Sequence, residues 1–328
     1  LCYYCAIYSI SGGFVSGEQM RITRKQAIES FRPGVPTLDS EPKSDLERDL
    51  RAKGIAQVAL EIHTNEFQDL SDQYAVCIDE HEELLRWTAG RFDANGIPED
   101  GHVSKNIKFN PAGMQIVDPK SLFHFNNNLW EKWSNTPKLY MPEDFRRFMD
   151  DGFALRQELT RTAKNLINVL NDSFTTMNEL HFPGGLCETT LRLLRYDGYA
   201  TRDDSGKLIV EQNARVAKAH NDRGCMTIQA YSSAPGFWCK TPGKHHPRYK
   251  KIYPPYGEGQ SQMFFGAGFR AIYGSRNNPI KPLYHGVDRI FDESLDYIPP
   301  RTAAILFTDA PLVDIAIKSN ETQPELAY

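Results

Sequence analysis

The chain has 328 residues, a length typical of one large domain or two ordinary ones. Its 40% hydrophobic and 24% charged residues exclude a disordered chain, a collagen-like chain and a coiled coil. A formal net charge of −4 argues against nucleic acid as the main partner. The sequence contains no run of 18 apolar residues, so it predicts no membrane-spanning helix.

Six cysteines are too few, in a chain of this length, for a dense disulfide framework. Cys2 and Cys5 have C-x-x-C spacing, but no second pair completes a zinc site, so we expect a structural or incidental role. Residues 1–15 are apolar and lack the basic start of a secretory signal. They could be the remnant of a targeting segment, but a cytoplasmic location is the default expectation.

The first half of the chain is predicted to be mostly helical. Residues 44–52 form a short charged helix with Ser44 as its N-cap, residues 55–62 form a strand, and Thr64 caps the next helix. Residues 93–142 are rich in Asn, Pro and Gly, which predicts loops with short elements. The clearest helix spans residues 143–174, where apolar residues recur in steps of three, four and seven.

The second half changes to short apolar or alternating segments separated by Gly, Pro, Asn and Asp, a pattern typical of antiparallel strands. Because helices come first and strands follow, the sequence predicts an α+β protein with a mainly β core. No glycine-rich phosphate-binding sequence follows a strand, which disfavours the dinucleotide and nucleotide triphosphate folds. The predicted strands are residues 190–196, 226–232, 262–273, 283–290, 301–308 and 312–317.

The most informative pattern is His220-Asn221-Asp222, an H-x-D sequence at the start of a predicted strand. In extended backbone, residues i and i+2 point to the same side, so this imidazole and this carboxylate can face one point. His285 follows in another predicted strand. Two histidines and one carboxylate on one face of a metal form the facial triad of non-haem Fe(II) oxygenases. The alternatives are a solvated loop pair for the H-x-D sequence and a buried core histidine for His285.

A further motif follows His285 in the chain, where Arg301 opens the predicted strand RTAAILF. This order resembles the Fe(II)/2-oxoglutarate-dependent dioxygenases, especially the branch with isopenicillin N synthase and the plant flavonoid and gibberellin oxygenases. That branch carries H-x-D-x-G-x-x-T, a glycine–aromatic step, a distal histidine and R-x-S. By the same comparison, LRLLRYDGY resembles the strand that gives a tyrosine to the co-substrate, here Tyr196. The other matching segments are HNDRGCMT at 220–227, PGFWC at 235–239, YHGV at 284–287 and RTA at 301–303.

The resemblance implies a double-stranded β-helix (jelly-roll) barrel at residues 181–328. A mostly helical N-terminal region with a long supporting helix, residues 1–180, would pack around it as one integrated domain. It also implies that His220, Asp222 and His285 hold Fe(II). Arg301, assisted by Tyr196, would bind the far carboxylate of the co-substrate 2-oxoglutarate.

The implied enzyme is a dioxygenase, an oxidoreductase that uses O2 and removes a hydrogen atom from a small-molecule substrate. The result would be hydroxylation, desaturation or oxidative ring closure, and the sequence does not decide among them. An amino-acid-derived metabolite of a specialised biosynthetic pathway fits this interpretation. Nucleic acid and membrane partners do not fit it, and the sequence does not indicate an oligomeric state.

Two positions depart from the family pattern. R-x-S reads Arg301-Thr302-Ala303, so one hydroxyl that would contact the distal carboxylate is missing, although the guanidinium can still form a bidentate pair. The common H-R-V reads His285-Gly286-Val287, and the stretch 240–260 is longer than usual. We therefore expect a divergent member of the family.

Three other functions fit the same residues. One is an Fe(II) oxidase of the same fold that does not use 2-oxoglutarate, and another is a non-catalytic metal-binding jelly-roll protein. The third is a zinc hydrolase built on the same three ligands, but this leaves Arg301 without a role.

Several other side chains have two interpretations each. His245 and His246 belong either to a solvated basic loop or to a lid that attracts an acidic substrate. His124 and Arg195 either line a substrate pocket or have packing and surface roles. Phe264 and Phe265 are expected in the core, with a substrate clamp as the alternative.

Overall fold

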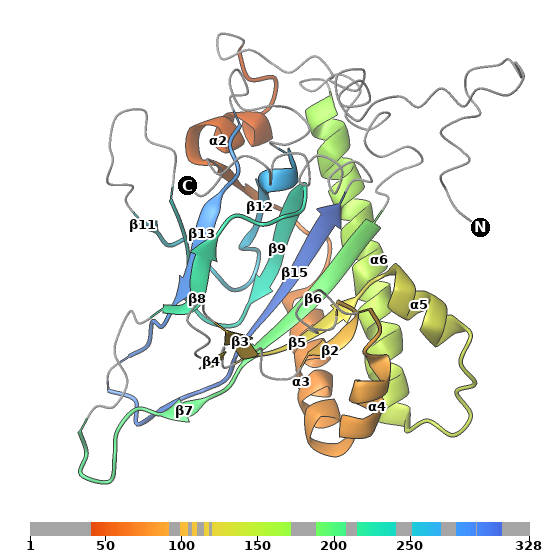
Figure 1. The fold of residues 1–328 in the computed structure, drawn as a ribbon. Helices are drawn as coiled ribbons and strands as arrows, with labels where there is room; N and C mark the ends of the chain where they lie inside the picture. Colours follow the sequence, from red (N-terminus) through yellow and green to blue (C-terminus); the bar gives the residue numbers. More distant parts are fainter. Residues whose placement is uncertain are drawn as a thin grey trace, which may run out of the picture. The chain divides into compact units, whose positions relative to one another are not determined.

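The fold consists of helices packed on a large antiparallel sheet, with a smaller sheet on the opposite side (Figure 1). Within the described ranges, no helix combines the length and apolar character needed to cross a membrane. The computed structural model describes residues 41–91, 99–103, 107–109, 115–117, 120–171, 188–207, 215–240, 251–269, 280–292 and 294–309.

The helices begin close to the predicted caps. Ser44 accepts a hydrogen bond from the backbone N–H of Glu47, and Gly54 ends that helix in the left-handed region at φ 74°. The second helix begins at Thr64, but its N-cap is His63, one residue before the predicted cap. The helices are α2 (Asp45–Lys53), α3 (Thr64–Glu80), α4 (Glu82–Thr88), α5 (Asn127–Ser134) and α6 (Glu143–Asn171).

The described strands form two main sheets and two short pairs. The large sheet has the order β1-β12-β9-β15-β6-β5-β2, and the small sheet has the order β11-β10-β13-β8. Every pairing in them is antiparallel. The strands of the large sheet are β1 (Ile55–Val58), β2 (Gly101–Val103), β5 (Lys120–Phe125), β6 (Glu188–Tyr196), β9 (Met226–Ser232), β12 (Ser261–Phe265) and β15 (Arg301–Asp309). The remaining strands are β3 (Ile107–Phe109), β4 (Gln115–Val117), β7 (Tyr199–Ala200), β8 (Arg215–His220), β10 (Phe237–Lys240), β11 (Lys251–Ile252), β13 (Tyr284–Asp288) and β14 (Tyr297–Ile298).

The two faces of the large sheet bury different partners. On one face, Leu306 of β15 packs in the main core with residues of α3 and α6. On the other face, Phe264 of β12 packs with Phe237 of the small sheet. We call this second face the inner face. Phe264 pairs with Thr227, and Thr227 pairs with Phe307, so these residues share the inner face. Side chains alternate along a strand, so every second residue from each of these also lies on it where the ladder is regular. On β15 the inner face carries Arg301, Ala303, Ile305 and Phe307.

Helix α6 lies along the large sheet, and one glycine permits its close approach (Figure 1). A Cβ atom on Gly152 would lie 2.1 Å from the Phe125 ring of β5. Glycine inside a helix costs up to about 1 kcal/mol relative to alanine. Here it allows Phe125 to pack between Phe148 and Phe153 of the helix, at ring-centroid distances of 5.3 Å to each.

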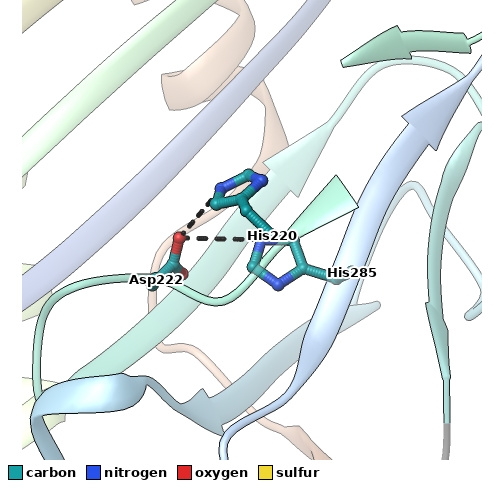
Figure 2. A group of neighbouring side chains, drawn as sticks. All are labelled: His220, Asp222 and His285. Atoms are coloured by element: carbon teal, nitrogen blue, oxygen red, sulfur yellow. Dashed lines mark ion pairs between the residues drawn. The ribbon is translucent and has the colours of Figure 1, made fainter. Parts of the chain in front are cut away.

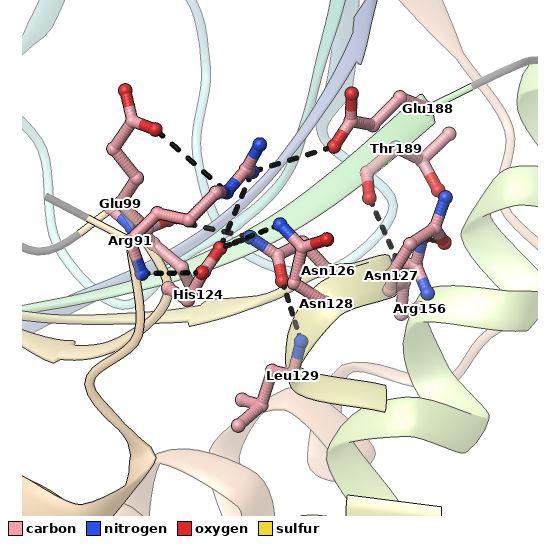
Figure 3. A network of polar contacts seen from close by, with 11 residues as sticks. Arg91, Glu99, His124, Asn126, Asn127, Asn128, Leu129, Arg156, Glu188 and Thr189 are labelled. Carbon is pink, nitrogen blue, oxygen red and sulfur yellow. Dashed lines mark hydrogen bonds and ion pairs between the residues drawn. The ribbon is translucent and has the colours of Figure 1, made fainter. Parts of the chain in front are cut away.

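A polar network fixes the corner where β5 leads into α5 (Figure 3). Asn126 caps α5 by accepting a hydrogen bond from the backbone N–H of Leu129 at 3.0 Å, and it donates to the Asp100 carboxylate. Arg156 of α6 donates from Nε to the carbonyl oxygen of Thr189 at 2.9 Å. These bonds tie the start of α5 to Asp100, next to β2, and α6 to β6.

The structure differs from the predicted elements in two places. The stretch 93–142, predicted to be loops with short elements, contributes β2 and β5 to the large sheet, and the sequence pattern did not indicate this pairing. The predicted strand 262–273 ends at Phe265, because Gly266 and Ala267 then donate backbone hydrogen bonds to Cys225 and Asp222. The predicted strand 312–317 lies outside the described residues, as do residues 172–174 of the predicted long helix and residues 270–273 of the predicted strand 262–273.

Candidate metal centre

The three predicted ligands come from neighbouring parts of the chain. His220 is the last residue of β8, and His285 of β13 is its direct partner across the ladder. Asp222 lies just after β8, in the loop that leads from the small sheet to β9 of the large sheet. The ladder and this loop together explain why residues far apart in sequence meet.

The ligand atoms of this group face one point (Figure 2). His220 Nε2 lies 3.3 Å and His285 Nε2 lies 3.6 Å from Asp222 Oδ1. All three ligand atoms lie within 4.8 Å of one another. Ligands bound at about 2.1 Å from a metal, at right angles, lie on the order of 3 Å apart, so small movements of these side chains would bring them into coordination range.

The carboxylate of Asp222 is buried and ionised. Burial alone would raise its pKa, but the His220 hydrogen bond, the charge of His285 and the Thr227 hydrogen bond outweigh this and lower the pKa to about 2. Thr227 Oγ1 donates to Asp222 Oδ2 at 2.6 Å, which leaves Oδ1 for the histidines. A charged oxygen in a buried position is the ligand that a hard or borderline divalent metal requires.

The His285 ring is held in the orientation that a metal ligand needs. Its Nδ1 lies 3.1 Å from the carbonyl oxygen of Leu283, so Nδ1 carries the proton and donates it. The lone pair of Nε2 therefore points toward Asp222 and His220. Burial lowers the pKa of His285 and the charge of Asp222 opposes this shift, so burial favours loss of the Nε2 proton, which a metal must displace.

One side of the centre is apolar and the other is open to solvent. The ring centroids of Phe264 and Phe237 lie 4.9 Å and 5.5 Å from that of His285, whose exposed fraction is 7%. The His220 side chain, by contrast, is 52% exposed. Two imidazoles and one carboxylate on one side, with an accessible opposite side, fit a metal that keeps positions for other ligands.

The two predicted co-substrate residues also lie together. Tyr196 of β6 and Arg301 of β15 are direct ladder partners, and the guanidinium carbon lies 5.3 Å from the tyrosine ring centroid. Arg301 donates from Nη2 to Ser232 Oγ at 2.8 Å and from Nε to the Ala234 carbonyl oxygen at 3.3 Å. No carboxylate among the described residues lies within salt-bridge distance of it, and burial lowers its pKa. An anion bound there would stabilise the charged guanidinium.

The departure at Gly286 has a structural reason. Gly286 is the ladder partner of Trp238, and a Cβ atom at this position would lie 2.8 Å from the Trp238 ring. The Trp238 indole donates to Asp288 at 2.8 Å, and Asp288 also accepts from Tyr253 at 2.7 Å and from Lys251. The larger residue of the common H-R-V pattern is therefore excluded by a tryptophan that is fixed in place.

The remaining candidate residues divide as follows. His124 is buried and accepts a hydrogen bond from Arg192 Nε at 2.8 Å. Arg195 lies on the opposite face of the sheet, where it lines a cavity of about 360 Å³ with residues of α3. Phe265 and Phe264 both lie in the core, as expected, and Phe264, which belongs to the cluster between the two sheets, also contacts His285. The histidines at 245 and 246 and the cysteines at 2 and 5 lie outside the described residues.

Sequence reasoning assigned no role to Thr227 or Ser232. Thr227 belongs to the HNDRGCMT segment, so the motif contained the signal but not the contact with Asp222. Ser232 had no motif to mark it, because its hydrogen bond with Arg301 depends on the pairing of β9 with β15.

Comparisons with known proteins identify the fold. No protein-family model matches the sequence, and a search of curated proteins finds no match. Among solved structures, a full-length Neurospora crassa protein in complex with alpha-KG and thymine has a TM-score of 0.60 and 14% identity, over 80% of this chain and 78% of that chain. A 2OG-Fe(II) oxygenase family protein from Caulobacter crescentus has a TM-score of 0.58 and 16% identity, over 81% and 80%. JOX2 in complex with 2OG, Fe and JA has a TM-score of 0.55 and 13% identity, over 80% and 69%.

The chain therefore has the fold of the 2OG-Fe(II) oxygenases. Within that fold, its described residues include a His-Asp-His group whose ligand atoms could hold a metal ion.

Proposed function

We propose that this protein is an Fe(II)- and 2-oxoglutarate-dependent oxygenase that oxidises a small molecule. The observation that carries the proposal is the convergence of His220, Asp222 and His285 in a chain with this fold. Two of the similar structures support it, because the Neurospora crassa protein is seen with alpha-KG and thymine, and JOX2 with 2OG, Fe and JA. We also infer that the two sheets form a double-stranded β-helix around the centre.

The three side chains would hold Fe(II) on one face and leave the other positions for co-substrate and O2. When bound, iron and 2-oxoglutarate would supply the oxidising chemistry, in which 2-oxoglutarate gives succinate and CO2 and one oxygen atom of O2 enters succinate. The other oxygen atom would enter a hydroxylated product, or leave as water with two hydrogen atoms of the substrate in desaturation or ring closure. The chain's own task is to position both small molecules and to limit water at the centre. Phe264 and Phe237 cover the His285 side, so water would reach the centre mainly from the His220 side.

Arg301 would bind the far carboxylate of 2-oxoglutarate. Its guanidinium lies on the inner face, the face that also carries Thr227, the hydrogen-bond partner of Asp222. Tyr196 would cover the guanidinium from β6. A planar guanidinium can pair with a carboxylate through two parallel hydrogen bonds, which fixes the orientation of the ligand as well as its affinity.

The direct test is O2-dependent succinate formation. The protein is loaded with Fe(II) under anaerobic conditions, and succinate is measured after addition of 2-oxoglutarate with and without O2. We expect succinate only when iron and O2 are both present, and none above background in the His285→Ala variant. Consumption of O2 without succinate would instead indicate an oxidase that does not use this co-substrate.

Substitution of Arg301 tests its assigned role separately from the metal. Loss of a bidentate charged pair costs about 3 kcal/mol, so Arg301→Ala should raise the 2-oxoglutarate concentration needed for half-maximal succinate formation about 100-fold. Arg301→Lys keeps the charge but not the planar fork and should give an intermediate value. An unchanged requirement in Arg301→Ala would contradict the role.

A further inference from the structure

The structure places a hydroxyl where the R-x-S pattern has lost one. Ala303 occupies the serine position of that pattern, and its direct ladder partner on β9 is Ser232. Both residues lie on the inner face, and both are buried. The Ser232 hydroxyl is thus on the neighbouring strand, on the same face and at the same level as the side chain it would replace.

Ser232 is bonded to Arg301 in a defined way. Its Oγ accepts a hydrogen bond from Arg301 Nη2 at 2.8 Å and donates to the carbonyl oxygen of Ala234 at 2.8 Å. The same carbonyl accepts from Arg301 Nε at 3.3 Å. The end of β9 therefore holds one edge of the guanidinium, the edge formed by Nε and Nη2.

This arrangement leaves the other edge of the guanidinium for a ligand. Arginine has five N–H donors, and two of them are used by Ser232 and Ala234. The other three, on Nη1 and Nη2, have no hydrogen-bond partner in the described part of the chain. A carboxylate that approaches end-on could accept one hydrogen bond from each terminal nitrogen.

We propose that Ser232 is the residue that positions Arg301 for the far carboxylate of the co-substrate, and that this support from β9 compensates for the direct contact that a serine at position 303 would make. This inference rests on the proposed function, since it assumes that Arg301 binds 2-oxoglutarate. Ser232 acts through the arginine and is a positioning residue, so its effect should be confined to ligands that carry the far carboxylate.

The test measures binding without turnover. Anaerobic calorimetry on the metal-loaded protein compares N-oxalylglycine, an unreactive analogue with both carboxylates, with 2-oxobutanoate, which lacks the far carboxylate. In Ser232→Ala we expect the Kd for N-oxalylglycine to rise about tenfold, while the Kd for 2-oxobutanoate changes less than about twofold. In the succinate assay, the KM for 2-oxoglutarate should rise while kcat stays within about twofold.

Two further variants make the comparison specific. Ser232→Ala combined with Ala303→Ser should restore most of the affinity for N-oxalylglycine, because it returns a hydroxyl to the same level on β15. Ser233→Ala is the matched control, since Ser233 accepts from the backbone N–H of Thr302 at 2.9 Å and does not contact Arg301. This control should leave both Kd values unchanged.

The outcomes separate the inference from the proposed function. An unchanged Kd for N-oxalylglycine in Ser232→Ala, equal losses for both ligands, or no recovery with Ala303→Ser would each overturn the role of Ser232. If the unsubstituted protein binds N-oxalylglycine no more tightly than 2-oxobutanoate, the proposed use of 2-oxoglutarate itself fails.

Discussion

The two oxygens of Asp222 have different partners. Oδ1 faces both histidines, and Oδ2 accepts from Thr227 Oγ1 at 2.6 Å. Thr227 is buried, so this bond fixes the rotation of the carboxylate before any metal arrives. The strand β9 thus contributes to the centre through a residue that is not itself a ligand.

Removal of the Thr227 hydroxyl should weaken metal binding without removing a ligand. Thr227→Val has nearly the same shape but no donor, so we expect the Kd for Mn²⁺ to rise about 10- to 100-fold. Thr227→Ser keeps the hydroxyl and serves as the control, with a change of about threefold or less. Equal affinities for the valine and serine variants, measured by calorimetry, would show that this hydrogen bond does not matter.

His124 gives the fold a dependence on pH that does not involve the metal centre. Its Nε2 accepts from Arg192 and its Nδ1 lies 3.0 Å from the Glu99 carbonyl oxygen, an arrangement that only the neutral ring satisfies. Burial, followed by the charge of Arg192, lowers the pKa of His124 to about 3, from an ordinary value of 6.5. As the pH falls through 6.5, His124 therefore takes up a proton in the unfolded chain but stays neutral in the folded chain.

The free energy of unfolding should accordingly fall as pH drops below 6.5, and this loss should continue toward pH 3. One such histidine contributes a loss of about 2 kcal/mol between pH 7 and pH 5. His124→Gln retains an acceptor for Arg192 but does not titrate, so its loss over this interval should be smaller by that amount. Urea unfolding of both proteins at pH 7, 6 and 5 measures the difference, and parallel curves would disprove the contribution.

At the scale of elements, the packing of α6 on β5 depends on Gly152. Alanine is the better helix former by up to about 1 kcal/mol, yet a Cβ atom at this position would meet the Phe125 ring at 2.1 Å. We expect Gly152→Ala to destabilise the protein by about 1–3 kcal/mol. The penalty should shrink in a Phe125→Leu background, and thermal or urea unfolding of the four proteins in this cycle measures it. Stabilisation by Gly152→Ala alone would contradict the predicted clash.

The elements predicted best from the sequence are those whose apolar residues recur with the spacing of a strand or a helix. The strand predicted at 226–232 is β9, and the long helix begins at Glu143 as expected, because alternation and helical spacing are local properties. Strands β2 and β5 were not distinguished from loops, since their place at the edge of the large sheet is set by pairing with β6. Tertiary pairing of this kind leaves only a weak trace in a six-residue segment.

The candidate site shows the same division. His220 and Asp222 are close in sequence, and a motif in family order pointed to His285 and Arg301. The structure brings His220, Asp222 and His285 together. It also pairs Arg301 with Tyr196. The contribution of Ser232 could not be predicted, because it depends on the register between two strands and on a bulge near Ala304.

At the scale of the whole molecule, the centre joins the two sheets. Both histidines belong to the small sheet, Asp222 lies in the connection to the large sheet, and Thr227 belongs to the large sheet. A metal bound to these ligands would therefore connect both layers of the fold. Because such an ion binds the folded chain and not the unfolded one, it should also raise the stability of the whole unit.

The most direct measurement of the central claim is a calorimetric titration with Mn²⁺, or with Fe²⁺ under anaerobic conditions. We predict one ion bound per chain in the unsubstituted protein and no measurable binding at that site in Asp222→Ala or His285→Ala. The Asp45→Ala variant is a matched control, because Asp45 is an exposed carboxylate that pairs with Arg48 at 2.7 Å and lies outside both groups of side chains that could hold a metal ion. Undiminished binding of one ion by both Asp222→Ala and His285→Ala would contradict the assignment of the metal centre.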